Sequence, residues 1–339
     1  MDRFLIVKLG AVGDVVHSLP VLETLRTRFP SARIGWVVEG AAEPLLRGHP
    51  LLDEVILLDR GRLKAPGGLR YFRSWARSLK GKKYGVAIDL HNLLKTGVIS
   101  FSSGAPVRIG FRRFREGNFI FTNRRVGEYK KYPHAVQKYL SLLGPLGINP
   151  GDWKIRFGLH WDPEDEKTSG AFWDENNWGP DEKVVAINPG ANWPSKQWPL
   201  GRFSQLADRL SGKYGVRILL LWGPGERNLA QGIAGGMDEA SFIAPETTLR
   251  SLLPLLLKCR LMISGDTGPV HLAAALGVPT VCLFGPSHPR RNAPFGEGHV
   301  VVQSPVPPAT HWQRKEVGNH WMAGIPVEKV FEAAAGKLE

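Results

Sequence analysis

Short glycine-containing segments with charged side chains follow several apolar runs of the 339-residue sequence. The first, Lys8–Asp14 (KLGAVGD), stands between an apolar run and a helical pattern. Gly10 and Gly13 permit a tight turn and a close approach of the backbone to a ligand. Free amides at the start of a helix favour negative charge. The spacing matches neither the dinucleotide fingerprint nor the phosphate-loop NTPase motif. Asp14 is therefore either a helix cap or a carboxylate base.

The segment Ser264–His271 (SGDTGPVH) also follows an apolar run and opens a helical pattern. Asp266 or Thr267 is suited to cap that helix, and Gly268 leaves room for a ligand close to the backbone. Amides at a helix start, without side-chain bulk, form a seat for a diphosphate. A well-capped helix is the alternative. The diphosphate seat is favoured because His271 adds a polar group one turn along.

Two further loops follow predicted strands of the second half. The loop Asn188–Pro199 (NPGANWPSKQWP) contains Gly190 and places Lys196 between two tryptophans. An ammonium group beside a diphosphate neutralises charge that develops on a leaving group; an exposed surface lysine is the alternative. In Trp222–Glu226 (WGPGE), Glu226 is suited either to bind ribose hydroxyls or to stabilise the first turn of a helix.

Apolar, β-branched runs alternate with helical patterns along the chain, which is typical of parallel sheets built from βαβ units. Strands are predicted at residues 4–8, 34–38, 54–58, 86–90, 184–188, 216–221, 261–264 and 280–284. Helices are predicted at residues 14–28, 200–211, 226–234, 249–258, 270–276 and 326–337. We therefore expect two α/β, Rossmann-like domains joined near residues 161–181. A cleft between such domains is the usual place for a ligand.

The positive charge of the chain is concentrated in one block. The formal net charge is +13, and residues 60–131 alone carry 18 Lys and Arg against 3 Asp and Glu, which leaves −2 for the remainder. Such a block attracts polyanions: nucleic acid, an anionic lipid surface or a phosphorylated substrate. A basic face that only aids solubility is the alternative. Arg112, Arg113 and Arg115 are the candidates for contacts with an anionic acceptor.

Other features of the sequence limit its chemistry and its location. No Asp-x-Asp pair, His-Glu-x-x-His or Gly-x-Ser-x-Gly motif occurs, so a metal-independent mechanism is expected. Cys259 and Cys282 are far apart and suit a reducing compartment as buried thiols. No apolar stretch is long enough for a signal peptide or a membrane span, which predicts a cytoplasmic protein.

Three segments together resemble a known family: residues 8–20 (KLGAVGDVVHSLP), 188–199 (NPGANWPSKQWP) and 266–287 (DTGPVHLAAALGVPTVCLFGPS). In order and spacing they resemble the lipopolysaccharide heptosyltransferases, glycosyltransferase family 9, over residues 4–335. The resemblance implies a GT-B fold, with two Rossmann-like parallel-sheet domains facing across a cleft. It also implies inverting transfer of heptose from ADP-heptose to Kdo-lipid A or heptosyl-Kdo-lipid A, without a metal or another cofactor. Residues 9–12 (LGAV) depart from the hydroxyl residues usual in the first heptosyltransferase, and residues 188–191 (NPGA) are closer to the second. His17–Pro20 is closer to the first.

The same resemblance implies roles for single residues. Asp14 matches the catalytic base, Lys8 a lysine beside it, and Lys196 the lysine that holds the donor phosphates. The donor-binding positions are Lys8, Gly13, Gly190, Lys196, Glu226, Asp266, Thr267, Gly268 and His271. The implied domains are an acceptor-binding domain at 1–165, a donor-binding domain at 180–315 and a C-terminal helix at 316–339 that packs back on the first domain. The acceptor would bring the protein to the anionic inner face of the cytoplasmic membrane.

Other functions fit part of the sequence. A family 9 enzyme that uses another nucleotide-sugar for a different surface glycan would share the motifs. A basic nucleic-acid-binding protein would explain the calculated pI of about 9.9, although no RNA- or DNA-binding module is recognisable. A catalytically silent nucleotide-binding scaffold is a third alternative, against which the presence of Asp14 speaks.

Overall fold

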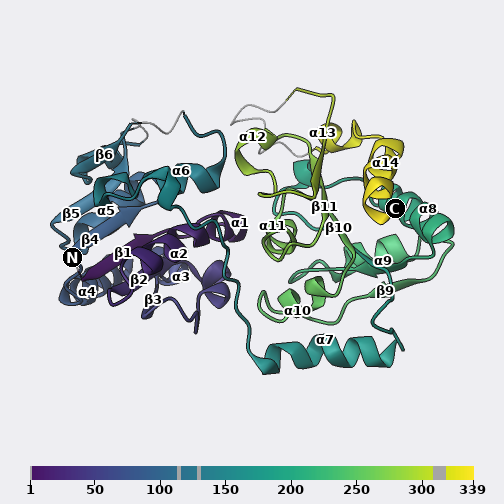
Figure 1. Ribbon diagram of the computed structural model, residues 1–339, viewed down its shortest axis with the longest axis horizontal. Coiled ribbons are helices and arrows are strands. Elements are labelled where there is room, and N and C mark those ends of the chain that lie inside the picture. The colour runs from purple at the N-terminus through teal and green to yellow at the C-terminus, as the bar shows by residue number, and fades with distance from the viewer. Residues whose placement is uncertain (1, 113–115, 128–130, 308–317) are drawn as a thin grey trace. The chain divides into compact units, whose positions relative to one another are not determined.

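The structure is a computed structural model that describes residues 2–112, 116–127, 131–307 and 318–339. The chain divides into two compact units, Met1–His160 and Trp161–Glu339, and each is an α/β unit built on a parallel sheet (Figure 1). The segment 161–181, predicted as a connection between domains, lies in the second unit and contains the helix α7 (Pro163–Glu175). Asp162 and Asp165 form a capping box at the start of this helix.

The sheet of the first unit has six parallel strands in the order β3-β2-β1-β4-β5-β6. Strands β1, β2 and β4 are almost entirely buried, as expected when helices cover both faces. The four predicted strands of this unit are confirmed. The strands are β1 (Arg3–Val7), β2 (Arg33–Val38), β3 (Glu54–Leu57), β4 (Val86–Asp89), β5 (Val107–Phe111) and β6 (Arg124–Val126).

Helices α4 and α5 cover one face of this sheet, where Leu79 and Ile99 pack against Leu5 and Val7 of β1. The helix predicted at 14–28 is divided into α1 and α2, because Pro20 has no N–H to continue the hydrogen-bonding pattern. The helical elements are α1 (Val12–Val16), α2 (Leu19–Arg28), α3 (Arg60–Lys64), α4 (Gly68–Gly81), α5 (Leu94–Ser102), α6 (Ala135–Ser141), η1 (Gly40–Leu45), η2 (Asn118–Ile120), η4 (Gly144–Leu146) and η5 (Pro150–Asp152).

The second sheet repeats this topology, in the order β12-β11-β10-β7-β8-β9 with all pairs parallel. Numbered from its own first strand, it has the same order as the first sheet, which is the Rossmann order. The fold class is therefore confirmed for both units. The strands are β7 (Val184–Asn188), β8 (Arg217–Leu220), β9 (Ser241–Ile243), β10 (Leu261–Gly265), β11 (Thr280–Phe284) and β12 (His299–Gln303).

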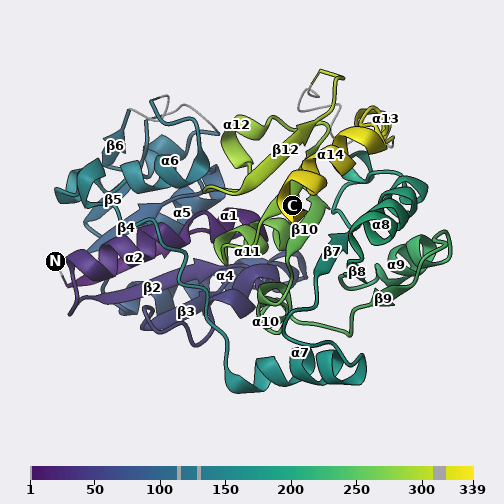
Figure 2. The same cartoon turned by 45° about the vertical axis from the view of Figure 1, so that its right-hand side comes forward.

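Helices cover both faces of the second sheet as well (Figure 2). Helices α8, α9 and α14 lie together on one face, and α10 and α11 pack against each other on the opposite face. The helical elements that follow α7 are η6 (Pro194–Lys196), α8 (Leu200–Tyr214), α9 (Arg227–Ala234), α10 (Leu252–Leu257), α11 (Gly268–Ala275), α12 (Pro289–Asn292), α13 (His320–Ala323) and α14 (Val327–Leu338).

The last helix, α14, packs against α8 and the sheet of its own unit. The expectation that the C-terminal helix packs back on the first domain stays a prediction. The apolar side of α14, with Val330, Phe331, Ala334 and Leu338, is buried in the core of the second unit. Arg209 of α8 adds an ion pair to Glu328, with nitrogen and oxygen 2.7 Å apart. Burial of the apolar side in this core accounts for the position of α14 in the second unit.

The strand order reverses at one point in each sheet. In the first sheet β1 lies between β2 and β4, and in the second β7 lies between β8 and β10. The helices that follow the two central strands leave toward opposite faces, so a crevice opens at the carboxyl ends of these strands. The loops with the predicted site residues begin there. In the described residues, no helix is long and apolar enough to cross a membrane.

Candidate active site

A hydrogen-bonded group of three side chains lies beyond the carboxyl end of β1. The ammonium of Lys8 donates to the hydroxyl of Tyr139 over 2.8 Å, and this hydroxyl donates to Oδ1 of Asp14 over 2.9 Å. The Lys8 nitrogen is 3.5 Å from the same carboxylate oxygen and 4.5 Å from the centre of the Tyr139 ring. The carboxylate is thus held from two sides.

The local sequence explains why Asp14 projects from the sheet edge. Lys8 continues the buried strand β1, and Val15 and Val16 anchor the short helix α1 in the core. Asp14 stands between them, and its side chain remains 32% exposed, whereas Lys8 is buried. The N-cap of α1 is Ala11, and no side chain caps this helix. The carboxylate contacts Tyr139 and Lys8 instead of capping the helix; its role as a base stays a prediction.

The second group lies beyond the carboxyl ends of β7 and β10. Oδ2 of Asp266 is 2.6 Å from the Lys196 ammonium and accepts a hydrogen bond from Ser287 over 3.0 Å. Nε2 of His271 lies 3.2 Å from Oδ1 of Asp266. Because an ionised carboxylate only accepts hydrogen bonds, Nε2 carries the proton. Asp266 is almost fully buried, while Lys196 is the more exposed partner.

These contacts change the acidity of Asp266. Burial raises its pKa, but the hydrogen bond from His271 and the charge of Lys196 outweigh burial, so the pKa lies well below its ordinary value. Burial, together with the negative charge of Asp266, holds the pKa of the Cys282 thiol well above its usual range. The Asp266 carboxylate is therefore a permanent anion that holds Lys196 in place.

A second network fixes the start of α11. The side-chain amide of Asn188 donates to Ser264 and Thr267 over 3.2 and 3.3 Å, and the two hydroxyls are 3.1 Å apart. Thr267 is the N-cap of α11, but its side chain makes no capping bond to the helix backbone. The first amides of α11, from Gly268 onward, therefore have no side-chain acceptor at the N-cap. This is the arrangement that binds anions at helix starts.

Glu226 reaches the loop that follows β7. A Cβ atom at Gly190 would meet the carboxylate of Glu226, so a side chain there would require Glu226 to move. Oε2 of this carboxylate accepts a hydrogen bond from the amide of Gly223 over 3.2 Å. The loops after β7 and β8 are thus in contact, with a carboxylate between them.

The predicted site residues form two groups, one in each unit. Gly13 lies in α1 with Asp14 and close to Lys8, so these positions belong to the first unit, while the other donor positions are in the second. Arg112 is exposed just after β5; Arg113 and Arg115 lie outside the described residues. The second-unit group comprises Gly190, Lys196, Glu226, Asp266, Thr267, Gly268 and His271.

Two contributors were missed in the sequence. Tyr139 lies 125 residues from Asp14 on α6, in a segment without a motif, so no local signal marks it. Ser287 follows β11 in the GPS sequence, and its place just after a strand end was a signal that could have been used. Within the described ranges, no group of three or more His, Cys, Asp and Glu side chains could hold a metal ion.

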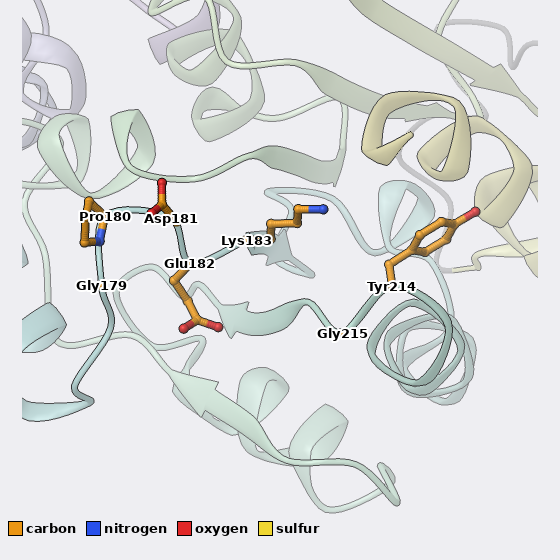
Figure 3. Close-up of a pocket in the computed structure, with 7 residues that line it drawn as sticks. All are labelled: Gly179, Pro180, Asp181, Glu182, Lys183, Tyr214 and Gly215. Atoms are coloured by element: carbon orange, nitrogen blue, oxygen red, sulfur yellow. The ribbon is translucent and has the colours of Figure 1, made fainter.

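A pocket in the second unit lies elsewhere (Figure 3). It is lined by the segment before β7 and by Tyr214 and Gly215 at the end of α8. These residues precede β7 and β8, so the pocket is at the amino ends of the strands. The candidate groups are at the carboxyl ends, and the pocket has no part in them.

Two Rossmann-order units, with charged side chains at the switch point of each, are the building blocks of the GT-B fold. Solved structures support this fold class. The chain is similar to a glycosyltransferase family 9 protein from Veillonella parvula, with a TM-score of 0.86 and 26% identity over 100% of this chain and 98% of that one. It also shares the fold of the Escherichia coli heptosyltransferase WaaC solved with ADP, with a TM-score of 0.79 and 23% identity over 99% of both chains.

Sequence comparisons identify the family. Residues 72–322 match the family described as glycosyltransferase family 9 (heptosyltransferase). Lipopolysaccharide heptosyltransferase 1 of Pseudomonas aeruginosa is 30% identical over 317 residues, covering 90% of this chain and 84% of that protein. Lipopolysaccharide heptosyltransferase 2 of Escherichia coli K12 is 27% identical over 311 residues, covering 89% and 88%. The chain belongs to glycosyltransferase family 9, which favours the transferase over the nucleic-acid-binding hypothesis.

The ionised state of Asp266 gives a prediction for stability. A carboxylate whose pKa is lower in the folded than in the unfolded state stabilises the folded protein at pH values above its unfolded-state pKa of about 4. This stabilisation is lost as the pH falls through the folded-state pKa. Asp266→Asn should lower the free energy of unfolding at pH 7 by on the order of 3 kcal/mol. The difference from wild type should shrink as the pH falls below about 4. Urea unfolding at several pH values measures it.

The control for this experiment is Asp181→Asn, which removes an exposed carboxylate of the same unit. It should leave the free energy of unfolding almost unchanged across the pH series. The difference in free energy of unfolding between wild type and Asp266→Asn could also stay constant down to about pH 3, which is below the unfolded-state pKa. That result would show that ionisation of Asp266 is not the cause of the difference.

Tyr139→Phe tests the hydrogen bonds that hold Asp14. The variant keeps the ring under Lys8 but removes the hydroxyl between Lys8 and Asp14. Because a hydrogen bond to a charged group contributes about 1.5–3 kcal/mol, kcat should fall roughly ten- to hundredfold and its pH profile should shift, with KM for the donor little changed. Steady-state kinetics over a pH series measures this. Tyr214→Phe, which removes a hydroxyl remote from the site, is the matched control; equal kinetics for both variants would contradict the role of Tyr139.

Proposed function

We propose that the protein transfers heptose from ADP-heptose to the inner core of lipopolysaccharide, with inversion at the anomeric carbon. The observation that carries the proposal is the accessible carboxylate of Asp14, held by Tyr139 and Lys8 at the switch point of the first sheet in a chain of family 9. The names of the relatives support the donor and the acceptor, since both heptosyltransferases 1 and 2 of lipopolysaccharide are similar to this chain. A solved neighbour of the same fold contains ADP.

The second unit supplies a site suited to the nucleotide diphosphate. The ammonium of Lys196 and the first amides of α11 carry positive charge, and each is held by the networks around Asp266 and Asn188. Groups that are already oriented stabilise developing charge without reorganisation during the reaction. Glu226 is suited to accept hydrogen bonds from the ribose hydroxyls. No metal or other cofactor has a role in this proposal.

The reaction is a single displacement. Asp14 takes the proton of the acceptor hydroxyl while that oxygen forms a bond to the anomeric carbon of the donor. The bond from the anomeric carbon to the phosphate oxygen breaks, and its electron pair leaves with ADP. Lys196 and the amides at Gly268 meet the charge on the departing diphosphate. Tyr139 and Lys8 keep the carboxylate oriented toward the acceptor.

The first unit is suited to the acceptor. It contains 27 Lys and Arg against 12 Asp and Glu, a net charge of +15, whereas the second unit has 17 against 19. Lipid A phosphates and Kdo carboxylates are anions, and so is the cytoplasmic leaflet of the membrane. We therefore place the protein in the cytoplasm, at the inner face of the cytoplasmic membrane, with Arg112 among its acceptor contacts. An acceptor panel of Kdo-lipid A and heptosyl-Kdo-lipid A assigns the first or the second transfer.

Loss of the base should affect turnover alone. Asp14→Asn keeps the size of the side chain but removes the proton acceptor, so kcat should fall by about 10²–10⁴-fold. ADP affinity, measured by calorimetry, should remain within about twofold, because Asp14 belongs to the other unit from the diphosphate seat. Turnover within a few-fold of wild type would end the assignment of Asp14 as the base.

Loss of the lysine should affect donor binding as well. Lys196→Ala removes a charge-assisted contact to the diphosphate, which is typically about 1.5–3 kcal/mol. The Kd for ADP should therefore rise roughly ten- to hundredfold, and kcat should fall. Lys213→Ala, an exposed lysine on α8, is the control. An unchanged Kd in Lys196→Ala would remove this residue from the donor site, whatever the result for Asp14.

A further inference from the structure

The solvent-facing side of α5 carries an apolar stripe beside the exposed Lys95. Leu94 and Phe101 are 45% and 58% exposed, and the partly buried Val98 lies between them. Residues four and three apart share one side of a helix, so the three side chains form a continuous stripe. A helix on the surface of a soluble protein usually presents polar side chains on this side. The exposed apolar stripe therefore departs from this rule, which indicates a surface that binds another molecule.

The short helix η2 extends the stripe. The rings of Phe101 and Phe121 are in edge contact at 5.8 Å, and η2 is packed tightly against α5. A Cβ atom at Gly97 would lie 3.0 Å from Phe121 and 3.1 Å from the carbonyl oxygen of Asn118. Gly97 is on the flank of α5 that adjoins the stripe, and η2, which packs against α5, carries Ile120 at 68% exposure. We call Leu94, Val98, Phe101 and Ile120 the α5–η2 patch.

Basic side chains surround this patch. The guanidinium of Arg108 lies 5.5 Å from the centre of the Phe101 ring. The aliphatic part of Lys80 covers Gly104: a Cβ atom added at Gly104 would lie 3.1 Å from Cγ of Lys80. The neighbouring helix α4 adds exposed basic residues along its length: Arg70, Arg73 and Arg77.

Acidic groups near the patch are few. Glu39 pairs with Lys95 at 3.1 Å, and Glu116 accepts a hydrogen bond from the amide of Leu94. The unit as a whole has a net charge of +15. An apolar centre with a basic rim matches the chemistry of an anionic bilayer surface, where apolar side chains enter the headgroup region and basic ones meet phosphates. A second copy is a poor partner, because two surfaces of the same high charge repel.

We propose that the α5–η2 patch inserts into the headgroup region of an anionic membrane, with Arg108, Lys80 and the arginines of α4 on lipid phosphates. Helix α5 begins five residues after the end of β4, and Lys95 in its first turn pairs with Glu39, which follows β2. The start of the patch is therefore at the edge of the first sheet that carries Asp14. A lipid-borne acceptor would reach this edge from the membrane. The purpose of the patch rests on the proposed function, but membrane binding itself does not.

The test is co-sedimentation of the full chain with vesicles of phosphatidylcholine that contain phosphatidylglycerol. The variant Leu94→Ser/Phe101→Ser/Ile120→Ser removes the apolar centre and keeps every charge. Three large, half-exposed apolar side chains contribute enough transfer free energy to change the partition coefficient about a hundredfold. Wild type should bind and the variant should bind about a hundredfold less. Leu257→Ser, which removes a 50% exposed leucine in the second unit, should bind like wild type.

Further measurements separate the possible outcomes. Circular dichroism and thermal unfolding should be the same for all variants, since each replaced side chain is exposed. Transfer to a soluble acceptor without acyl chains should be unchanged in the triple variant, while transfer to an acceptor embedded in vesicles should fall; failure of the proposed function would abolish both in wild type. Equal vesicle binding by the triple variant and wild type would overturn the proposal. A wild-type dimer that the triple variant converts to a monomer would also overturn it, in favour of contact between copies.

Discussion

A parallel sheet whose strand order reverses must send the helices after its two central strands to opposite faces, and the position of every candidate group depends on this constraint. The reversal separates β1 from β4 in the first sheet and β7 from β10 in the second. Ligands of open α/β sheets bind at such a reversal, outside the carboxyl ends of the strands. Asp14 follows β1, Lys196 follows β7 and Asp266 follows β10. The same topology, used twice, thus produces one charged group in each unit.

The two lysine–aspartate pairs are arranged in opposite senses. In the first unit Lys8 is buried and Asp14 is the exposed partner; in the second Asp266 is buried and Lys196 is the more exposed. A buried charge is stable only when it is paired and hydrogen-bonded. Tyr139 meets this requirement for Lys8, and His271 and Ser287 meet it for Asp266. The buried member therefore fixes its partner, and the exposed member remains accessible; in our proposal it acts as a base in the first unit and as a cation in the second.

Local pattern was enough to predict most of this arrangement. The central strands β1, β4, β7 and β10 are short apolar runs, and each was found within one or two residues. Glycine and a charged residue follow β1, β7 and β10. The outer strands β5, β6, β9 and β12 were missed, because half-buried and polar edge strands have no distinctive pattern. Tyr139 was missed for another reason: its role comes from the packing of α6 near α1, which no local sequence encodes. The contacts of α14 within its own unit come from the burial of its apolar side, which includes Phe331.

The unequal charge of the two units fits the different ligands that we propose for them. A nucleotide diphosphate carries its charge on one compact group, so in this proposal one lysine and a few oriented amides are sufficient and the second unit needs no excess charge. A lipid-borne acceptor brings several phosphates and carboxylates in variable positions, together with the anionic leaflet in which it lies. A diffuse field from many basic side chains acts on such a target from a distance and without fixed geometry. Long-range attraction does not orient the enzyme, however. The apolar α5–η2 patch supplies that orientation, because its side chains gain free energy only when this face meets the bilayer.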